Sequence, residues 1–138
     1  MTVSVVSPER VLFSGEATQV ITRILGTGEI AFLPGHAPFI GALTENHTRI
    51  YLADGLIVDV AVHGGFVEVS NNKVNILSDV AELAENIDRE RALRAMRAAQ
   101  EAMQHADREE NAETFASFAR AMARVNATGG LGASSSAH

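Results

Sequence analysis

Hydrophobic residues alternate with polar ones through roughly the first 83 residues and then recur at every third or fourth position. A period of two is typical of half-buried strands, and a period of 3.6 is typical of amphipathic helices. The change falls at Asn86–Ala92, where Asp88 can cap the first turn of a helix. Ile87 and Ala92 can form a small hydrophobic staple across that cap. The pattern therefore predicts an α+β protein in two parts, with strands first and helices second.

The N-terminal part consists of short apolar runs separated by Gly, Pro, Asn and Asp. The runs are residues 3–6, 10–13, 16–25, 29–33, 39–43, 48–52, 56–62, 66–69 and 74–77. Asp54-Gly55 and Ser70–Lys73 each lie between two runs, which predicts two hairpins. Many short strands at close spacing predict an antiparallel β-sandwich, or flattened barrel, over residues 1–83.

The second part contains two amphipathic segments. The first is predicted to be a helix from Asp88 to about Gln104, with the stripe Ala92, Ala95, Met96, Ala99 and Met103. A capping box at Asp107–Glu110 predicts a second helix that ends near Asn126, with the apolar face Phe115, Phe118, Ala119, Met122 and Val125. The short connection predicts an antiparallel helical hairpin over residues 84–128, followed by a flexible Gly/Ser-rich tail at 129–138.

The alanine-rich stripes predict that this hairpin is held shut only weakly. Alanine has few carbons to bury, and each buried methylene contributes only about 0.8 kcal/mol. A helix of this length is also marginal on its own in water. The hairpin is therefore expected to be a two-state element whose balance a ligand can change.

Composition excludes several classes of function. The 138 residues include 11 Lys and Arg against 17 Asp and Glu, with no Trp and one Tyr, which argues against a nucleic-acid partner. The absence of cysteine excludes a disulfide scaffold and a thiolate nucleophile. No run approaches the roughly 18 apolar residues of a membrane span, and no signal peptide pattern precedes the first strand. We expect no nucleic-acid binding and no direct membrane insertion.

Catalytic and metal sites are not predicted either. His36, His47 and His63 are scattered, and none has a His partner two or four positions away, which disfavours a cupin-like metal site. Ser14 lacks the Gly-x-Ser-x-Gly elbow of a hydrolase nucleophile. No phosphate-cradling loop of Walker type occurs. We therefore expect a protein that is not an enzyme, with no metal.

The arginines of the hairpin are the candidate ligand-binding residues. A turn near residue 107 would place Arg91 near Arg124 and Arg94 near Arg120, so that several guanidinium groups converge at the open end. Arginine suits phosphate because its planar fork donates two hydrogen bonds at once. The alternative is that each arginine is solvated or paired with an acidic residue, namely Glu82, Glu85 or Glu90.

Five motifs occur in order along the chain. They are Phe13-Ser14-Gly15, Gly28-Glu29-Ile30, Pro34-Gly35-His36-Ala37-Pro38, His63-Gly64-Gly65-Phe66 and Ile87-Asp88-x-x-Arg91-Ala92. Together they resemble the epsilon subunit of bacterial F-type ATP synthase, and the match runs to about Asn126; the mitochondrial counterpart, called delta, is similar. The resemblance implies a non-catalytic rotor subunit of the central stalk that binds the gamma subunit and the c-ring. It also implies a peripheral location on the cytoplasmic face of the bacterial plasma membrane.

The resemblance further implies that the hairpin regulates the motor. In this family the closed hairpin packs beside the sandwich, and the open hairpin reaches the alpha/beta catalytic head and blocks ATP hydrolysis. Some bacterial members stabilise the closed form with ATP, so ATP is a possible regulatory ligand and no cofactor is required. The implied ATP site consists of Glu82, Ile87, Asp88, Arg91, Ala92, Arg120 and Arg124.

Each of these residues has an expected role. Ile87 and Ala92 would form an apolar wall for adenine. Glu82 and Asp88 would accept hydrogen bonds from the nucleotide, and the arginines would meet the phosphates. Ala98 departs from the family pattern, because ATP-binding relatives often have another arginine there. Arg97 is the nearest substitute, but one residue corresponds to about 100° around a helix.

Glu29 and His36 are the implied contacts with the c-ring. The stiff proline loop around His36 would hold its shape under torque. The alternatives are a solvated turn acid for Glu29 and, for His36, a turn residue bonded to its own loop. A free-standing nucleotide-sensing module is the alternative function for the whole chain.

Overall fold

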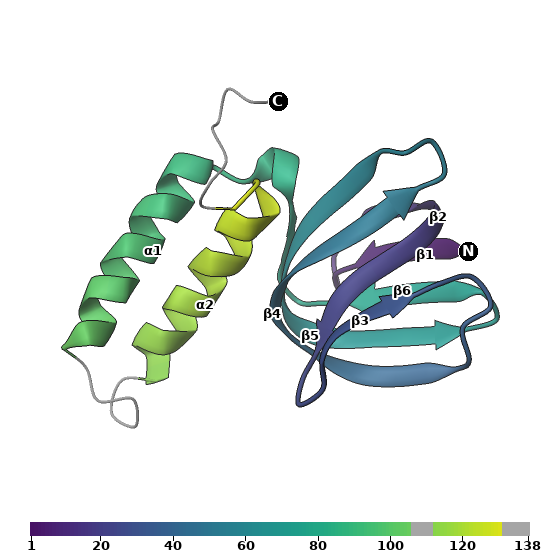
Figure 1. The fold of residues 1–138 in the computed structure, drawn as a ribbon, viewed down its shortest axis with the longest axis horizontal. Helices are drawn as coiled ribbons and strands as arrows, with labels where there is room; N and C mark the ends of the chain where they lie inside the picture. The colour runs from purple at the N-terminus through teal and green to yellow at the C-terminus, as the bar shows by residue number, and fades with distance from the viewer. Residues whose placement is uncertain (106–111, 131–138) are drawn as a thin grey trace.

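The computed structural model describes residues 1–105 and 112–130, which form a β-sandwich followed by two helices (Figure 1). The predicted fold class is therefore confirmed. The strands are β1 (Thr2–Val6), β2 (Val11–Ile24), β3 (Gly28–Phe32), β4 (Phe39–Leu52), β5 (Ile57–Ser70), β6 (Lys73–Leu77) and β7 (Ala81–Leu83). A short 3₁₀-helix, η1 (Ala84–Asn86), leads to α1 (Arg89–Gln104) and α2 (Ala112–Ala127).

The strands form one sheet that closes on itself. Their order is β1-β6-β5-β4-β2-β3, β7 pairs with β5, and β1 pairs with β2 as well as with β6. The pairings are antiparallel except that between β1 and β6, which is parallel. The predicted antiparallel sandwich therefore contains one parallel pair, β1–β6. Closure leaves β1 without a free edge, because it has a neighbour on each side.

Three strands are longer than predicted. β2, β4 and β5 each span 14 residues and run through positions expected to be turns or gaps. β5 continues through Gly64 and Gly65, which have φ values of +82° and +116°, and keeps its register with β4 on both sides of them. Glycine adopts positive φ without the steric cost that a Cβ imposes, so the strand bends here instead of ending.

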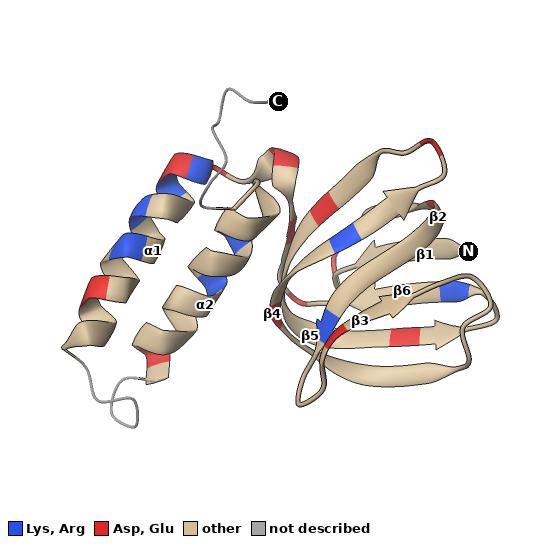
Figure 2. Cartoon of the chain, viewed as in Figure 1, with Lys and Arg blue, Asp and Glu red and all other residues tan. Residues whose placement is uncertain are grey.

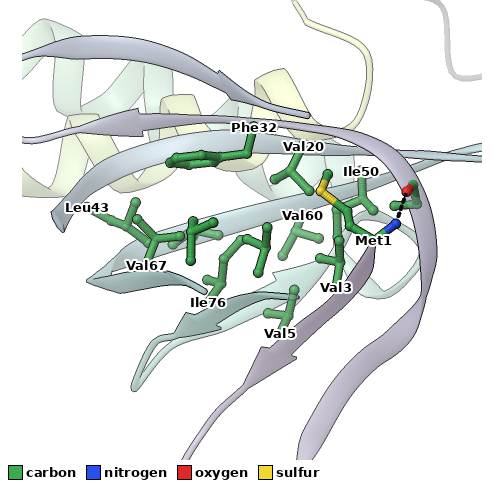
Figure 3. Close-up of a cluster of buried hydrophobic side chains, with 14 of the residues drawn as sticks. Met1, Val3, Val5, Val20, Phe32, Leu43, Ile50, Val60, Val67 and Ile76 are labelled. Carbon is green, nitrogen blue, oxygen red and sulfur yellow. Dashed lines mark hydrogen bonds between the residues drawn. The ribbon is translucent and has the colours of Figure 1, made fainter. Parts of the chain in front are cut away.

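The buried members of the sandwich core are mostly aliphatic, with Phe32 among them, and Phe13 and Phe39 pack against it partly buried. Figure 3 shows its side chains, which come from strands of both layers and point toward one another. The largest fully buried members include Phe32, Ile50 and Ile76. Each such side chain contributes roughly 1.5–3 kcal/mol through burial. No residue of the two helices belongs to this cluster, so the sandwich has a core of its own.

The start of α1 matches the sequence prediction. Asp88 accepts a hydrogen bond at Oδ1 from the backbone N of Arg91 (3.1 Å), and Ile87 packs against the cluster that contains Ala92. Ala92, Met96 and Ala99 are buried as predicted, but Ala95 is exposed. Ala95 lies about 100° around the helix from Met96, which places it outside the contact with α2. The capping box at 107–110 and residues 131–138 of the tail lie outside the described residues.

α2 is buried on two sides, because it lies between α1 and the sandwich (Figure 1). Ala121 and Val125 pack against α1, together with the partly buried Phe118 and Met122. Ala123 and Ala127 pack against Ala61 of β5. The sequence prediction gave α2 a single apolar face and missed the three buried alanines, Ala121, Ala123 and Ala127. The hairpin is thus closed, and α2 is the helix that holds it to the sheet.

Candidate functional site

The contact between the hairpin and the sandwich contains little apolar surface. Its buried members are Ala61, Ala123 and Ala127, with Ala84 and Ile87 partly buried beside them. The strand positions around Ala61 on the same side of the sheet carry charged or titratable side chains, namely Glu45, His47, Arg49, Asp59, His63 and Glu82. Alanine side chains contribute little burial energy, so much of the docking must come from polar contacts.

A pocket of about 410 Å³ lies where the linker, α1 and α2 meet. Its lining residues are Glu82, Asn86, Ile87, Asp88, Arg91, Ala92, Ala95 and Arg124. All residues of the predicted ATP site except Arg120 are among them. The sequence analysis missed Asn86 and Ala95 as lining residues; Ala95 follows Ala92 by three positions on the same helix face, which is a signal that could have placed it there.

Glu82 is the acidic centre of this pocket. Its Oε1 accepts a hydrogen bond from Arg124 Nε (2.6 Å) and lies 2.8 Å from His63 Nε2. Burial raises the pKa of Glu82, but the hydrogen bonds from Arg124 and His63 outweigh burial and leave the pKa below its ordinary value of 4.5. The carboxylate is therefore ionised in the closed structure and joins β7 of the sandwich to α2 of the hairpin.

Glu82 is expected to make the closed hairpin acid-sensitive. Because its pKa is lowered in the folded chain, its contribution to stability is fully present above pH 4.5 and is lost as pH falls through the lowered pKa. We expect Glu82→Gln to lower the thermal midpoint of the helical circular-dichroism signal at pH 6, and the difference from wild type to shrink below pH 4.5. Glu113→Gln is the matched control, because Glu113 is exposed and pairs with Arg120 on its own helix. Equal effects of the two substitutions would contradict the assignment.

The arginines do not all converge as predicted. Arg91 and Arg124 share the pocket, whereas Arg120 donates from Nη2 to Glu113 Oε1 (2.5 Å) and to Ser117 Oγ (3.0 Å). For Arg124 the alternative of an acidic partner holds, with Glu82 as that partner. Figure 2 shows that the arginines of α1 gather in the half of the helix near η1. Acidic residues lie at the same end of the hairpin, at η1 and at the start of α1, and Arg91 is exposed among them.

Arg89 ties the two ends of the hairpin together. Its guanidinium donates to the backbone oxygens of Thr128 (3.1 Å) and Gly130 (2.5 Å), and to Thr128 Oγ1 (2.9 Å). These acceptors belong to Thr128 and Gly130, which directly follow the C-terminal end of α2. Sequence analysis did not identify this contact, because its partners lie about 40 residues further along the chain.

Glu29 and His36 lie at opposite ends of β3, so the structure does not bring them together. Glu29 is exposed and lies 3.5 Å from Arg49 Nη2. His36 Nδ1 is 2.7 Å from the carbonyl oxygen of Ala37. The centroids of the His36 and Phe32 rings are 4.9 Å apart in a T-shaped arrangement. The local bond expected in the alternative for His36 is therefore present. A role in rotor contact remains a prediction for both residues.

Two features are absent from the residues that the structure describes: a group of possible metal ligands and a helix that could cross a membrane. Over 1–105 and 112–130, no group of three or more His, Cys, Asp and Glu side chains is placed to hold a metal ion. In the same ranges no helix has both the length and the apolar character that crossing a membrane requires. His47 and His63 instead pair with carboxylates of neighbouring strands.

Family models and relatives agree on one assignment. The model described as "ATP synthase, Delta/Epsilon chain, beta-sandwich domain" matches residues 1–84, and that described as "long alpha-helix domain" of the same chain matches residues 85–129. The "ATP synthase epsilon chain" of Desulfitobacterium hafniense is 40% identical over 126 residues, which cover 91% of this chain and 94% of the relative. That of Streptomyces avermitilis is 43% identical over 90 residues, which cover 65% of this chain and 72% of the relative.

The solved structures show the same fold at greater distance. A chain in the Euglena gracilis mitochondrial ATP synthase, titled "OSCP/F1/c-ring in rotational state 1", matches with a TM-score of 0.71 and 21% identity. That match covers 85% of this chain and 74% of the other. The order of sandwich and hairpin, the motif at Ile87–Ala92 and the two family models lead to one conclusion: the chain belongs to the delta/epsilon chain family of ATP synthase, as a homologue of epsilon chains.

Proposed function

We propose that this chain is the central-stalk epsilon subunit of an F-type, proton-translocating ATP synthase. In this role it couples the catalytic head to the c-ring, and its hairpin restrains ATP hydrolysis. The observation that carries the proposal is the docking of the hairpin, in which small alanines form the buried apolar contact with the sandwich and Glu82 pairs with Arg124. Such an interface allows the hairpin to detach while the separate core of the sandwich stays intact. The subunit performs no chemistry and is peripheral to the cytoplasmic face of the bacterial plasma membrane.

Exposed apolar side chains on the sandwich support its docking to other subunits. Phe66 and Leu77 are neighbours across β5 and β6, and Ile40 lies on the adjacent strand β4. Their exposed fractions are 57%, 44% and 73%. Clusters of exposed large apolar residues mark surfaces that partners cover. We assign this surface to the gamma subunit, and the Glu29 and His36 regions to the rotor ring.

The pocket beside η1 is the proposed regulatory ATP site. Its volume of about 410 Å³ lies within the range of about 300–1,000 Å³ that is usual for small-ligand sites. Ile87 and Ala92 supply the apolar wall for adenine, while Arg91 and Arg124 supply positive charge for the phosphates. Bound ATP would hold both helices and the linker at once, and so favour the closed hairpin. Arg120 joins the phosphates only after it leaves Glu113.

Titration calorimetry of the full chain with ATP tests this site. We expect Arg124→Ala to weaken ATP binding about tenfold or more, the factor for losing a hydrogen bond to a charged group. Arg94→Ala is the matched control, because Arg94 is an exposed arginine of the same hairpin that is not among the pocket's lining residues. Equal binding by wild type and Arg124→Ala, or no binding by wild type at millimolar ATP, would refute the site.

A free-standing nucleotide-sensing module is the second candidate, because the pocket could serve a sensor outside any assembly. Affinity capture of the tagged chain at its native expression level separates the two functions. We expect the chain to copurify with a large ATPase assembly that contains gamma and c subunits. Recovery of the chain alone, still able to bind ATP, would favour the sensor.

A further inference from the structure

His63 occupies an unusual position at the junction of the sandwich and the hairpin. Its ring is 3% exposed and lies between two carboxylates, with Nδ1 2.6 Å from Glu45 Oε2 and Nε2 2.8 Å from Glu82 Oε1. Glu82 Oε1 also accepts from Arg124 of α2. Four side chains therefore form one continuous chain of contacts, from β4 through β5 and β7 to the hairpin. None of the functions proposed above uses His63 or Glu45.

The position of the His63 ring between two carboxylates determines which protonation state of the ring satisfies both contacts. An ionised carboxylate only accepts hydrogen bonds, and a neutral imidazole carries a single N–H. With both ring nitrogens facing carboxylate oxygens, a neutral ring would turn one lone pair toward an anion. The protonated ring donates on both sides and places a positive charge between two negative ones. The arrangement is therefore complete only with His63 protonated.

The charged groups around the ring come from three different elements. Glu45 faces His63 from β4, Glu82 from β7, and Arg124 from α2 through Glu82. Asp79, in the turn before β7, lines the same cavity of about 390 Å³ as His63. Two carboxylates thus contact the His63 ring, and the nearest arginine is paired with one of them, Glu82.

We propose that His63 is the positioning residue of a pH-dependent latch: when protonated it fixes Glu82 in the orientation that binds Arg124, and when neutral it releases the hairpin. When His63 loses its proton, only one of the two carboxylates still receives a hydrogen bond from the ring. No positive charge then lies between Glu45 and Glu82. Glu82 is then free to turn away from Arg124. The alanine contact at Ala61 contributes little to hold α2 in place without this pair.

The latch predicts how the docked population of the hairpin changes with pH. The docked population is expected to fall as pH rises from 5.5 to 8.5, because the neutral ring no longer donates to both carboxylates. It is also expected to fall in acid, where Glu82 gains a proton. One consequence rests on the proposed function: in the assembled enzyme, alkaline conditions would release the hairpin toward the catalytic head.

The absence of native cysteine allows a direct measurement of docking. Spin labels at Glu68→Cys on β5 and Gln100→Cys on α1, both exposed positions, report the distance between sandwich and hairpin. The experiment uses the full chain without nucleotide, from pH 5.5 to 8.5, so its failure would leave the proposed ATP site and assembly role untouched. We expect wild type to lose docked population as pH rises.

His63→Gln is the main test variant. Glutamine offers one amide donor group and cannot carry the positive charge, so we expect the open-to-docked ratio at pH 6 to rise about tenfold. The same variant should also lose the dependence on pH above 6. Glu45→Gln is a second variant, expected to raise that ratio by a smaller factor while the ring keeps its bond to Glu82. It keeps the proposal testable should His63→Gln fail to fold.

His105→Gln is the matched control, because His105 is exposed and follows the end of α1 that lies away from η1. It should keep the docked population and pH profile of wild type. The latch would be refuted by a wild-type docked population that is constant over this range. It would also be refuted by a folded His63→Gln or Glu45→Gln chain that behaves as wild type at every pH.

Discussion

Gly65→Ala is expected to destabilise the sandwich by roughly 3–5 kcal/mol, a large part of the 5–15 kcal/mol that holds a typical domain folded. Gly65 has a φ of +116°, and a Cβ built there would lie 2.1 Å from the backbone oxygen of Leu77 and 2.9 Å from Cα of Ser78. Both contacts are with backbone, which cannot turn aside as a flexible side chain can. Relief requires β6 to move away from β5, and that would open the core around Ile76 and Val67.

Urea unfolding of the purified variant measures this effect. Gly55→Ala is the matched control, because Gly55 also has a positive φ, +89°, but a Cβ there would meet nothing within 4 Å. It should cost only the backbone strain, about 1–2 kcal/mol. If the two variants were equally stable, the close approach of β5 and β6 at Gly65 would not be a determinant of this fold.

The predictions that succeeded concern local features of the sequence. The change of period at Asn86–Ala92 and the cap at Asp88 depend on residues a few positions apart, so the sequence alone carries them. The predicted break at Gly64 and Gly65 failed for a related reason. Glycine pairs are common in turns, but here pairing with β4 continues on both sides, and only the closed sheet determines that.

The second face of α2 could not be predicted from its pattern. Ala123 and Ala127 are small enough to be exposed or buried, and their burial depends on Ala61, some 60 residues earlier. The candidate site also combines residues that are near in sequence with residues from distant parts of the chain. Ile87, Asp88, Arg91 and Ala92 are near in sequence, and the hairpin geometry predicted that Arg91 lies near Arg124. The association with Glu82 came from the family resemblance.

Two polar features of the site had no sequence signal that we recognised. Arg120 turns to Glu113, seven residues back on its own helix, although its position matches the family pattern for phosphate binding. His63 contacts Glu45 and Glu82 because β4, β5 and β7 lie side by side. Such contacts depend on strand register, which alternating apolar residues do not specify across a whole sheet.

Removal of the hairpin is expected to have the largest effect on function. A chain that ends at Asn86 retains every residue of the sandwich core, because that core contains no residue beyond Ile76 among its buried members. It also retains Ile40, Phe66 and Leu77, the surface assigned to the gamma subunit. The truncated chain should therefore fold and assemble, while it lacks the only segment proposed to reach the catalytic head. ATP hydrolysis by the assembly should then proceed faster than with the full chain.

The control is the subunit composition of the two assemblies, measured by gel densitometry, so that a faster rate is not the result of lost subunits. Arg124→Ala provides a graded comparison, because it keeps the hairpin but removes its bond to Glu82. A hairpin released more often should inhibit more strongly, so this full-length variant is expected to hydrolyse ATP more slowly than wild type. Its rate therefore separates release of the hairpin from its removal.

The rate of ATP hydrolysis by the purified assembly, with the full chain and with the chain that ends at Asn86, tests the central claim most directly. The claim is that a weakly docked helical hairpin restrains a rotary ATPase. A higher rate with the truncated chain, at equal subunit content, is the predicted result. An unchanged rate would contradict the claim and leave the sandwich as a coupling element without a brake.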